Sequence, residues 1–245
     1  MLIELLILVS IFFIGSFIQG VSGFGFGLIA MSFLPLLFTV KESTLLVVAL
    51  AFVLSVSIAV QMFRHIQWKA IIILLSAALL GRICAFFILD QHGDNDILKV
   101  LLGIFLIAVV VYFFKSKRPD VNRVTNRTWL PALLGLGGGL VGGVFAVGGP
   151  FFVFYMLLIF SNDKYAYSAN LQVSFVMTSL TTILLHGING DFNVDFFVYF
   201  LVGVISVLVG SRIGVLFFKR ISQENIKKLA AVVVAVAAIN LILFG

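Results

Sequence analysis

Two clusters of glycine lie in the middle of the longest uncharged stretches of this chain. Residues 20–27 read GVSGFGFG, and residues 141–150 read VGGVFAVGGP. Glycine accepts positive φ and lets another chain or a ligand approach the backbone. The second cluster ends in Gly-Gly-Pro, the pattern of a helix start with proline at its first position. Because a helix start offers free N–H groups and a positive dipole end, both clusters are candidate anion-binding turns.

Two arginines form a second group that could bind an anion. Arg82 lies in LLGRICAFFI (79–88) and Arg212 lies in LVGSRIGVLFF (208–218), at corresponding places in two similar apolar segments. Charged residues inside apolar membrane segments are costly and are usually functional. A long side chain near a segment end can instead extend to the membrane interface. The correspondence between the two segments favours a functional pair.

Polar residues follow the second glycine cluster at helical spacing. Asn170, Ser174, Thr178 and Thr182 recur every four residues, which places them on one face of a helix. Serine and threonine can also simply bond their own helix. The predicted substrate-binding residues are Ser22, Gly23, Gly25, Gly27, Gly148, Gly149, Pro150, Arg82, Arg212, Asn170, Gln172, Ser174 and Thr178.

The composition determines which elements must position these residues. Hydrophobic residues make up 62% of the 245 residues and charged residues only 11%. A membrane-spanning helix needs about 20 apolar residues, so the chain is predicted to be an all-α polytopic membrane protein. The formal net charge of +6 does not indicate nucleic-acid binding, because the basic residues lie in short loops beside apolar segments. Six segments fit one crossing each, at roughly 44–63, 70–89, 97–114, 166–186, 195–218 and 226–244.

Two uncharged runs are too long for one crossing. They extend from Leu5 to Val40 and from Thr128 to Asn162. Each would reach about 50 Å as a straight helix, against a hydrocarbon core of about 30 Å. Because the glycine clusters lie near their middles, each run is predicted to be a broken hairpin.

The distribution of lysine and arginine selects the topology. If each long run crossed once, the loop charges would divide equally between the two faces. If each run is a hairpin, Lys41 and Lys99 lie on one face and twelve of the 16 Lys and Arg lie on the other. This asymmetry satisfies the positive-inside rule. We therefore predict a multi-pass protein of the cell inner (plasma) membrane with both termini outside.

The hairpin topology makes the two halves inverted repeats, an architecture common among transporters. Each repeat is a broken, re-entrant-like helical hairpin followed by three transmembrane helices. The predicted organisation is a first repeat over residues 1–114, a cytoplasmic basic linker over 115–128 and a second repeat over 129–245. A weak in-register match between residues 22–37 and 143–158 supports this division.

The two hairpins, GFGFGLIAMSFLPLL and GGVFAVGGPFFVFYML, with a basic loop between them, resemble the sulfite exporter TauE/SafE family, also called the toluene sulfonate uptake permeases. The resemblance covers essentially the whole chain. It implies a secondary membrane transporter, or permease, for small organic or sulfur-containing anions such as sulfite, sulfonates or sulfoacetate. Transport would occur by alternating access at the two helix breaks. The first hairpin has Leu28-Ile29 where the second has Gly149-Pro150, so the halves need not contribute equally.

Two other functions stay open on the sequence alone. An anion channel would have the same charge pattern, and only turnover measurements separate a channel from a carrier. Residues 20–23 match the GxSG motif of rhomboid intramembrane serine proteases, with His186 as a conceivable partner for Ser22. So short a motif has little specificity in a glycine-rich chain, and it leaves the second hairpin unexplained.

The expected partners follow from this interpretation. They are a small anionic substrate, the lipid bilayer and a coupling proton or sodium ion, with no nucleic acid. We expect no enzyme activity, and no cofactor, since no dinucleotide-binding or phosphate-binding loop motif occurs. We expect no metal, because no histidine has a partner at ligand spacing, which indicates interfacial histidines and not a metal site or a proton relay. An oligomer is compatible with the sequence, which does not set the direction of transport.

Overall fold

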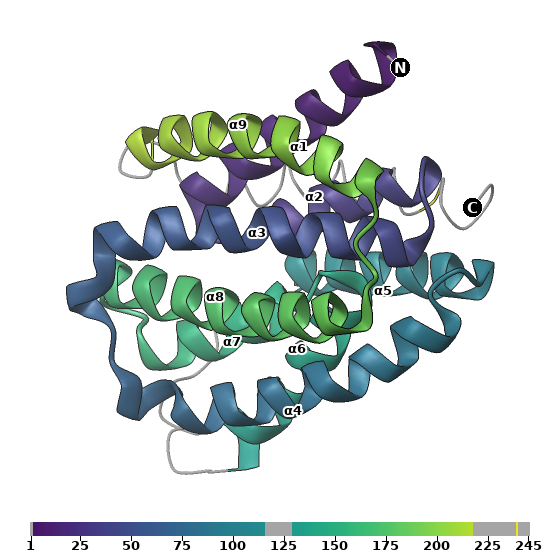
Figure 1. Cartoon of the computed structure of the whole chain (residues 1–245). Helices are drawn as coiled ribbons and strands as arrows, with labels where there is room; N and C mark the ends of the chain where they lie inside the picture. Colours follow the sequence, from purple (N-terminus) through teal and green to yellow (C-terminus); the bar gives the residue numbers. More distant parts are fainter. Residues whose placement is uncertain (1, 116–128, 218–238, 240–245) are drawn as a thin grey trace.

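The computed structural model describes residues 2–115, 129–217 and 239 (Figure 1). Every regular element in these ranges is a helix, which confirms the predicted all-α class. The linker predicted over 115–128 and the crossing predicted over 226–244 lie almost entirely outside the described residues. In chain order the elements are α1 (Leu2–Ser22), α2 (Phe26–Phe33), η1 (Leu34–Leu36), α3 (Val40–Met62), η2 (Phe63–His65), α4 (Trp68–His92), α5 (Asp96–Lys115), α6 (Trp129–Phe145), α7 (Gly149–Ile159), α8 (Lys164–Asn189) and α9 (Val194–Phe217).

Five helices within the described part of the chain are long and apolar enough to cross a membrane: α1 from Glu4 onward, α3, α4, α8 and α9. Large apolar side chains on their outer surfaces, such as Leu80, Ile205 and Leu216, are 60%, 69% and 75% exposed. So much exposed apolar surface is unfavourable in water and suits a lipid environment. The chain is a multi-pass membrane protein.

Each glycine cluster is a point where one helix ends and the next folds back beside it. α2 returns along α1, where Phe26 packs against Gly15, and α7 returns along α6, where Phe152 packs against Gly138. Glycine permits this close spacing within each hairpin. The hairpin arms are unequal, because α1 is long enough to cross a membrane whereas α2 has eight residues and α7 has eleven.

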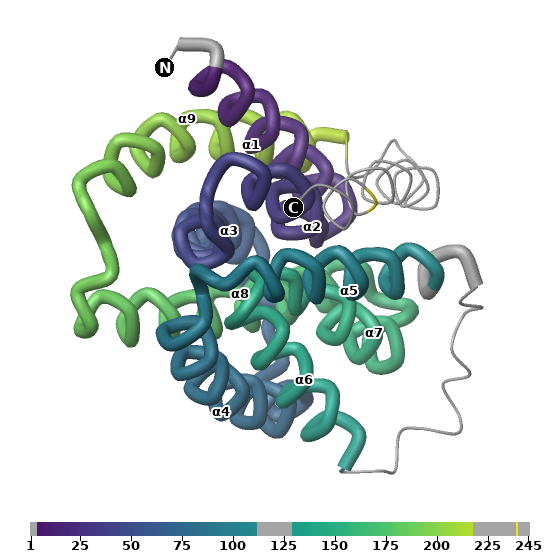
Figure 2. Tube along the Cα trace, turned by 90° about the vertical axis from the view of Figure 1, so that its right-hand side faces the viewer, coloured from purple at the N-terminus to yellow at the C-terminus, as the bar shows by residue number. Residues whose placement is uncertain are grey.

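Each hairpin packs on a long helix from the other half of the chain. α1 lies along α9, with Gly210 against the α1 backbone at Phe13, and α6 lies along α4, with Gly139 against the α4 backbone at Ala78. Figure 2 shows these two pairs on opposite sides of the molecule, with α3 and α8 between them. The central pair, α3 and α8, therefore holds the two hairpins together.

Candidate functional site

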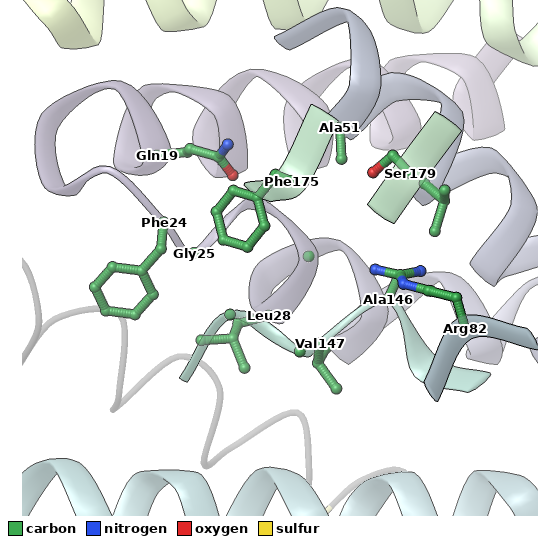
Figure 3. Close-up of a pocket in the computed structure, with 14 residues that line it drawn as sticks. Gln19, Phe24, Gly25, Leu28, Ala51, Arg82, Ala146, Val147, Phe175 and Ser179 are labelled. Carbon is green, nitrogen blue, oxygen red and sulfur yellow. The ribbon is translucent and has the colours of Figure 1, made fainter. Parts of the chain in front are cut away.

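The two helix breaks meet at a cavity between the helices (Figure 3). Four predicted glycines, Gly25, Gly27, Gly148 and Gly149, lie on this cavity together with Arg82. Its volume, measured as the space open to the centres of water molecules, is about 40 Å³. The cavity therefore has room for a few waters. The described residues that line it are Gln19, Phe24, Gly25, Gly27, Leu28, Val48, Ala51, Arg82, Ala146, Val147, Gly148, Gly149, Phe175 and Ser179.

The first break separates α1 from α2. Gly23 and Gly25 have φ angles of 84° and 116°, a region that L side chains rarely adopt. No side chain caps the start of α2, so the N–H groups of its first turn have no side-chain acceptor. The break is fixed from α8, because Gln172 Nε2 donates to the Gly23 carbonyl at 2.7 Å. The Oε1 atom of Gln172 in turn accepts from Gln19 Nε2 at 3.2 Å.

The second break, between α6 and α7, has different backbone geometry. Its left-handed residue is Ala146, with φ of 55°, whereas Gly148 is in the ordinary right-handed helical region. α7 begins at Gly149, so Pro150 is its second residue and not its first, and no side chain caps that helix. Thr44 Oγ1 on α3 fixes the break by donating to the Val144 carbonyl at 2.8 Å.

The glycines on the cavity have different roles. A side chain at Gly27 would meet the carbonyl oxygen of Ala146, and one at Gly148 would meet the backbone of α6. Both glycines therefore permit backbone packing, and Gly27 brings the two breaks together. A methyl group at Gly149 would make only ordinary contacts with two aromatic rings, at 3.6 Å or more. The start of α7 is thus accessible from the cavity.

Among the described residues that line the cavity, Arg82 is the only one with a charged side chain. It extends from α4, is 5% exposed, and its Nη1 donates to the Gly142 carbonyl at 2.6 Å and to Thr182 Oγ1 at 3.1 Å. Its Nε is buried and has no hydrogen-bond partner in the described ranges. No ion pair joins Arg82 to a carboxylate among the described residues. A buried cation without a counter-ion is strongly unfavourable, so the site favours an anion.

Arg212 is not brought to this cavity. It is exposed on α9, although its segment resembles that of Arg82. Gly81 directly precedes Arg82, whereas Ser211 stands between Gly210 and Arg212. Gly81 faces α6 and Gly210 faces α1, so each glycine marks the packed face of its helix. The extra residue, Ser211, places Arg212 about 100° further around α9 than the residue that directly follows the glycine. The buried Ser211 occupies the position that corresponds to Arg82.

The polar stripe on α8 is buried, but its three predicted substrate-binding residues, Asn170, Ser174 and Thr178, do not line the cavity. Asn170 Oδ1 accepts from Gln67 N at 2.8 Å, which ties the start of α4 to α8. The hydroxyls of Ser174 and Thr178 each donate at 2.8 Å to the carbonyl one turn earlier in α8. The other predicted residues that shape the breaks without lining the cavity are Ser22, Gly23, Pro150 and Gln172.

Nine of the described lining residues were not in the predicted set: Gln19, Phe24, Leu28, Val48, Ala51, Ala146, Val147, Phe175 and Ser179. Gln19 had a sequence signal, because it is an amide inside an uncharged apolar run directly before the first glycine cluster. The two phenylalanines had none, since the chain contains 27 of them. Their position depends on packing between distant segments.

The arrangement of these groups is suited to a small anion. Two uncapped helix starts direct the positive ends of their dipoles at the cavity. Arg82 adds a full positive charge, while Gln19 and Ser179 add neutral polar groups. The fold and the site thus define a multi-pass membrane protein of the broken-helix type, in which two short helices face one shared cavity.

The chain belongs to the sulfite exporter TauE/SafE family, whose model matches residues 7–241. It is also 26% identical, over 265 aligned positions, to a probable membrane transporter protein of Methanocaldococcus jannaschii; the match covers 98% of this chain and 97% of that protein. No solved structure matches the chain. Family membership confirms the resemblance seen in the two hairpin motifs, and together with this relative it supports a membrane transporter.

Proposed function

We propose that the chain is a secondary transporter, a permease for small organic or sulfur-containing anions such as sulfite, sulfonates or sulfoacetate. The observation that carries this proposal is the buried Arg82, whose Nε has no partner and whose charge has no carboxylate partner in the described residues. An anion oxygen at Nε would supply the missing acceptor and compensate the charge. The accessible start of α7 at Gly149 would provide a second contact.

Transport would proceed by alternating access at the two helix breaks. The crossed pairing of α1 with α9 and of α6 with α4 supports this mechanism. If the halves are inverted repeats, α1 corresponds to α6 and α4 to α9, so the two pairs are equivalents of each other. Two equivalent pairs on either side of a central α3–α8 pair could exchange conformations, opening the cavity to each face in turn.

The structure favours a carrier over the two alternatives. An open channel needs a continuous water-filled path across the membrane, whereas this cavity has room for only a few waters. A serine protease would need Ser22 beside His186. In the described geometry the Ser22 hydroxyl bonds the Ile18 carbonyl and the His186 ring bonds Asp191. We therefore propose a transporter without enzyme activity.

The test compares Arg82→Gln with Arg212→Gln, a matched control at the exposed arginine. Binding of sulfite and methanesulfonate to purified protein would be followed by ligand-induced thermal stabilisation, and transport by uptake into proteoliposomes. Arg82→Gln should weaken binding by about 10- to 100-fold, the cost of losing a charged hydrogen-bond donor. Arg212→Gln should behave like the parent. Parental affinity in a folded Arg82→Gln protein would refute the assignment of this residue.

A further inference from the structure

Side chains on α4 and α8 form successive contacts that lead away from the cavity. Arg82 on α4 bonds Thr182 on α8. One helical turn further along both helices, Phe86 packs edge-on against His186, with ring centroids 4.8 Å apart. Since the paired numbers increase together, α4 and α8 run in the same direction here. His186 therefore lies one turn beyond the cation of the proposed anion site.

His186 is a buried histidine with one unused nitrogen. Its side chain is 1% exposed, and its Nδ1 lies 2.5 Å from Asp191 Oδ2. A carboxylate can only accept a hydrogen bond, so in the neutral imidazole this partner assigns the ring hydrogen to Nδ1 and leaves a lone pair on Nε2. Nε2 is buried and has no partner in the described ranges. It is a free proton acceptor inside the protein.

Acidic groups connect this histidine to the surface. Asp191 and Asp90 both pair with Lys41 Nζ, at 2.9 Å and 3.2 Å. Asn189 Nδ2 donates to Asp90 Oδ1 at 2.9 Å. This is the third contact between α4 and α8 in this series, after Arg82 with Thr182 and Phe86 with His186. The Asp90 side chain is 36% exposed. A proton would bind at Nε2, because Nδ1 already carries the hydrogen shared with Asp191, and these carboxylates would stabilise the resulting positive charge on the ring.

We propose that His186 is the proton-binding site of this transporter, occupied together with the anion at Arg82. The inference rests on the proposed anion site. The charged groups around the ring are Asp191 from the loop after α8, Asp90 from α4 and Lys41 from α3. Arg82 lies about one helical turn away, through its contact with Thr182. While Arg82 is uncompensated, a second positive charge one turn away is disfavoured. An anion at Arg82 removes that repulsion, so anion and proton promote each other's binding by the same factor.

The experiment measures protons taken up when the purified full-length chain binds methanesulfonate, a strong-acid anion whose charge does not change near neutral pH. Calorimetric titrations in buffers of different protonation enthalpy give this number. The wild-type protein should take up a proton, and its affinity should weaken with rising pH, approaching about tenfold per pH unit. His186→Gln should bind without proton uptake. His92→Gln, at an exposed histidine near the same end of α4, should match the wild type.

The outcomes separate this inference from the proposed function. Wild-type binding with no proton uptake and no pH dependence overturns the role of His186 and requires no variant to fold. Proton uptake that persists in His186→Gln overturns it as well. Failure of the wild-type protein to bind any tested anion would refute the proposed function, and the proton site with it.

Discussion

Gly149 is the residue at which anion approach can be separated from helix packing. A methyl group there has space, whereas one at Gly27 would meet a backbone oxygen. Gly149→Ala should therefore leave thermal stability unchanged and weaken anion binding by about tenfold, or about 1.4 kcal/mol, by filling the space in front of α7. Gly27→Ala should destabilise the folded protein. Unchanged affinity in Gly149→Ala would mean that the substrate does not approach this helix start.

Asp191 should make stability depend on pH. Burial tends to raise the pKa of Asp191, but hydrogen bonds with His186, Lys41 and Asn189 outweigh it, and the pKa lies below its ordinary value. A lowered folded-state pKa contributes stability above the unfolded value, about 4, and that contribution is lost as the pH falls through the folded-state pKa.

Asp191→Asn should accordingly lower the melting temperature of the purified protein at pH 7. The difference from the wild type should shrink as the pH falls below the unfolded-state pKa of about 4 and through the lowered folded-state pKa, because the wild-type carboxyl then becomes protonated. Melting curves across this range provide the measurement. A difference that stays constant with pH would show that the charge of Asp191 contributes nothing.

The sequence predicted those residues of the candidate site that are unusual for their immediate surroundings in the chain. The glycine clusters and Arg82 stand out because they are unusual within apolar segments. Residue types did not predict that Arg82 is buried at the cavity whereas Arg212 is exposed. The difference arises because one extra residue in α9 places Arg212 on another face of its helix. Gln19 donates a hydrogen bond to Gln172, which lies 153 residues later in the chain. This contact could not be predicted from the sequence, because it forms only when the first hairpin packs on α8.

At the scale of the elements, the small residues of α6 should be sensitive to size. A side chain at Gly139 would meet the α4 backbone at Ala78, whereas one at Gly187 in α8 has only ordinary contacts with the Phe192 ring. Gly139→Ala should cost about 1–3 kcal/mol by overpacking and lower the melting temperature by several degrees. Gly187→Ala should be neutral or slightly stabilising, because alanine favours helix. Equal melting temperatures for the two variants would contradict close α4–α6 packing.

The elements themselves were largely predictable from apolar length and glycine position. The predicted crossings at 70–89 and 166–186 lie within α4 and α8, and the one at 44–63 covers most of α3 and the first residue of η2. What was not predictable is the backbone of each turn. The left-handed residue of the second break is an alanine, although glycine is available two positions later. Such a conformation is imposed by surrounding packing, here by Thr44 and the close approach of Gly27.

The topology of the whole molecule can be tested at two exposed residues. Asp94 lies between α4 and α5, and Lys164 starts α8. The hairpin topology places Asp94 outside and Lys164 in the cytoplasm, whereas single crossings of both long runs would put them on the same face. Single cysteines at these positions, in a Cys84→Ala background, should react with an impermeant reagent from opposite faces. Labelling from one face would contradict the hairpin topology and the inverted repeat.

The crossed pairing of hairpins and long helices has a consequence for how the protein is made. While only the first half has left the ribosome, the face of α1 that later packs against Gly210 of α9 has no partner. The face of α4 that later packs against Gly139 of α6 has no partner either. Neither half can complete its contacts before the other has been inserted. The nascent chain must therefore keep the α4 surface without its partner until α6 is inserted, and the α1 surface without its partner until α9 is synthesised. Halves expressed as separate polypeptides would depend on each other as the two subunits of an obligate dimer do.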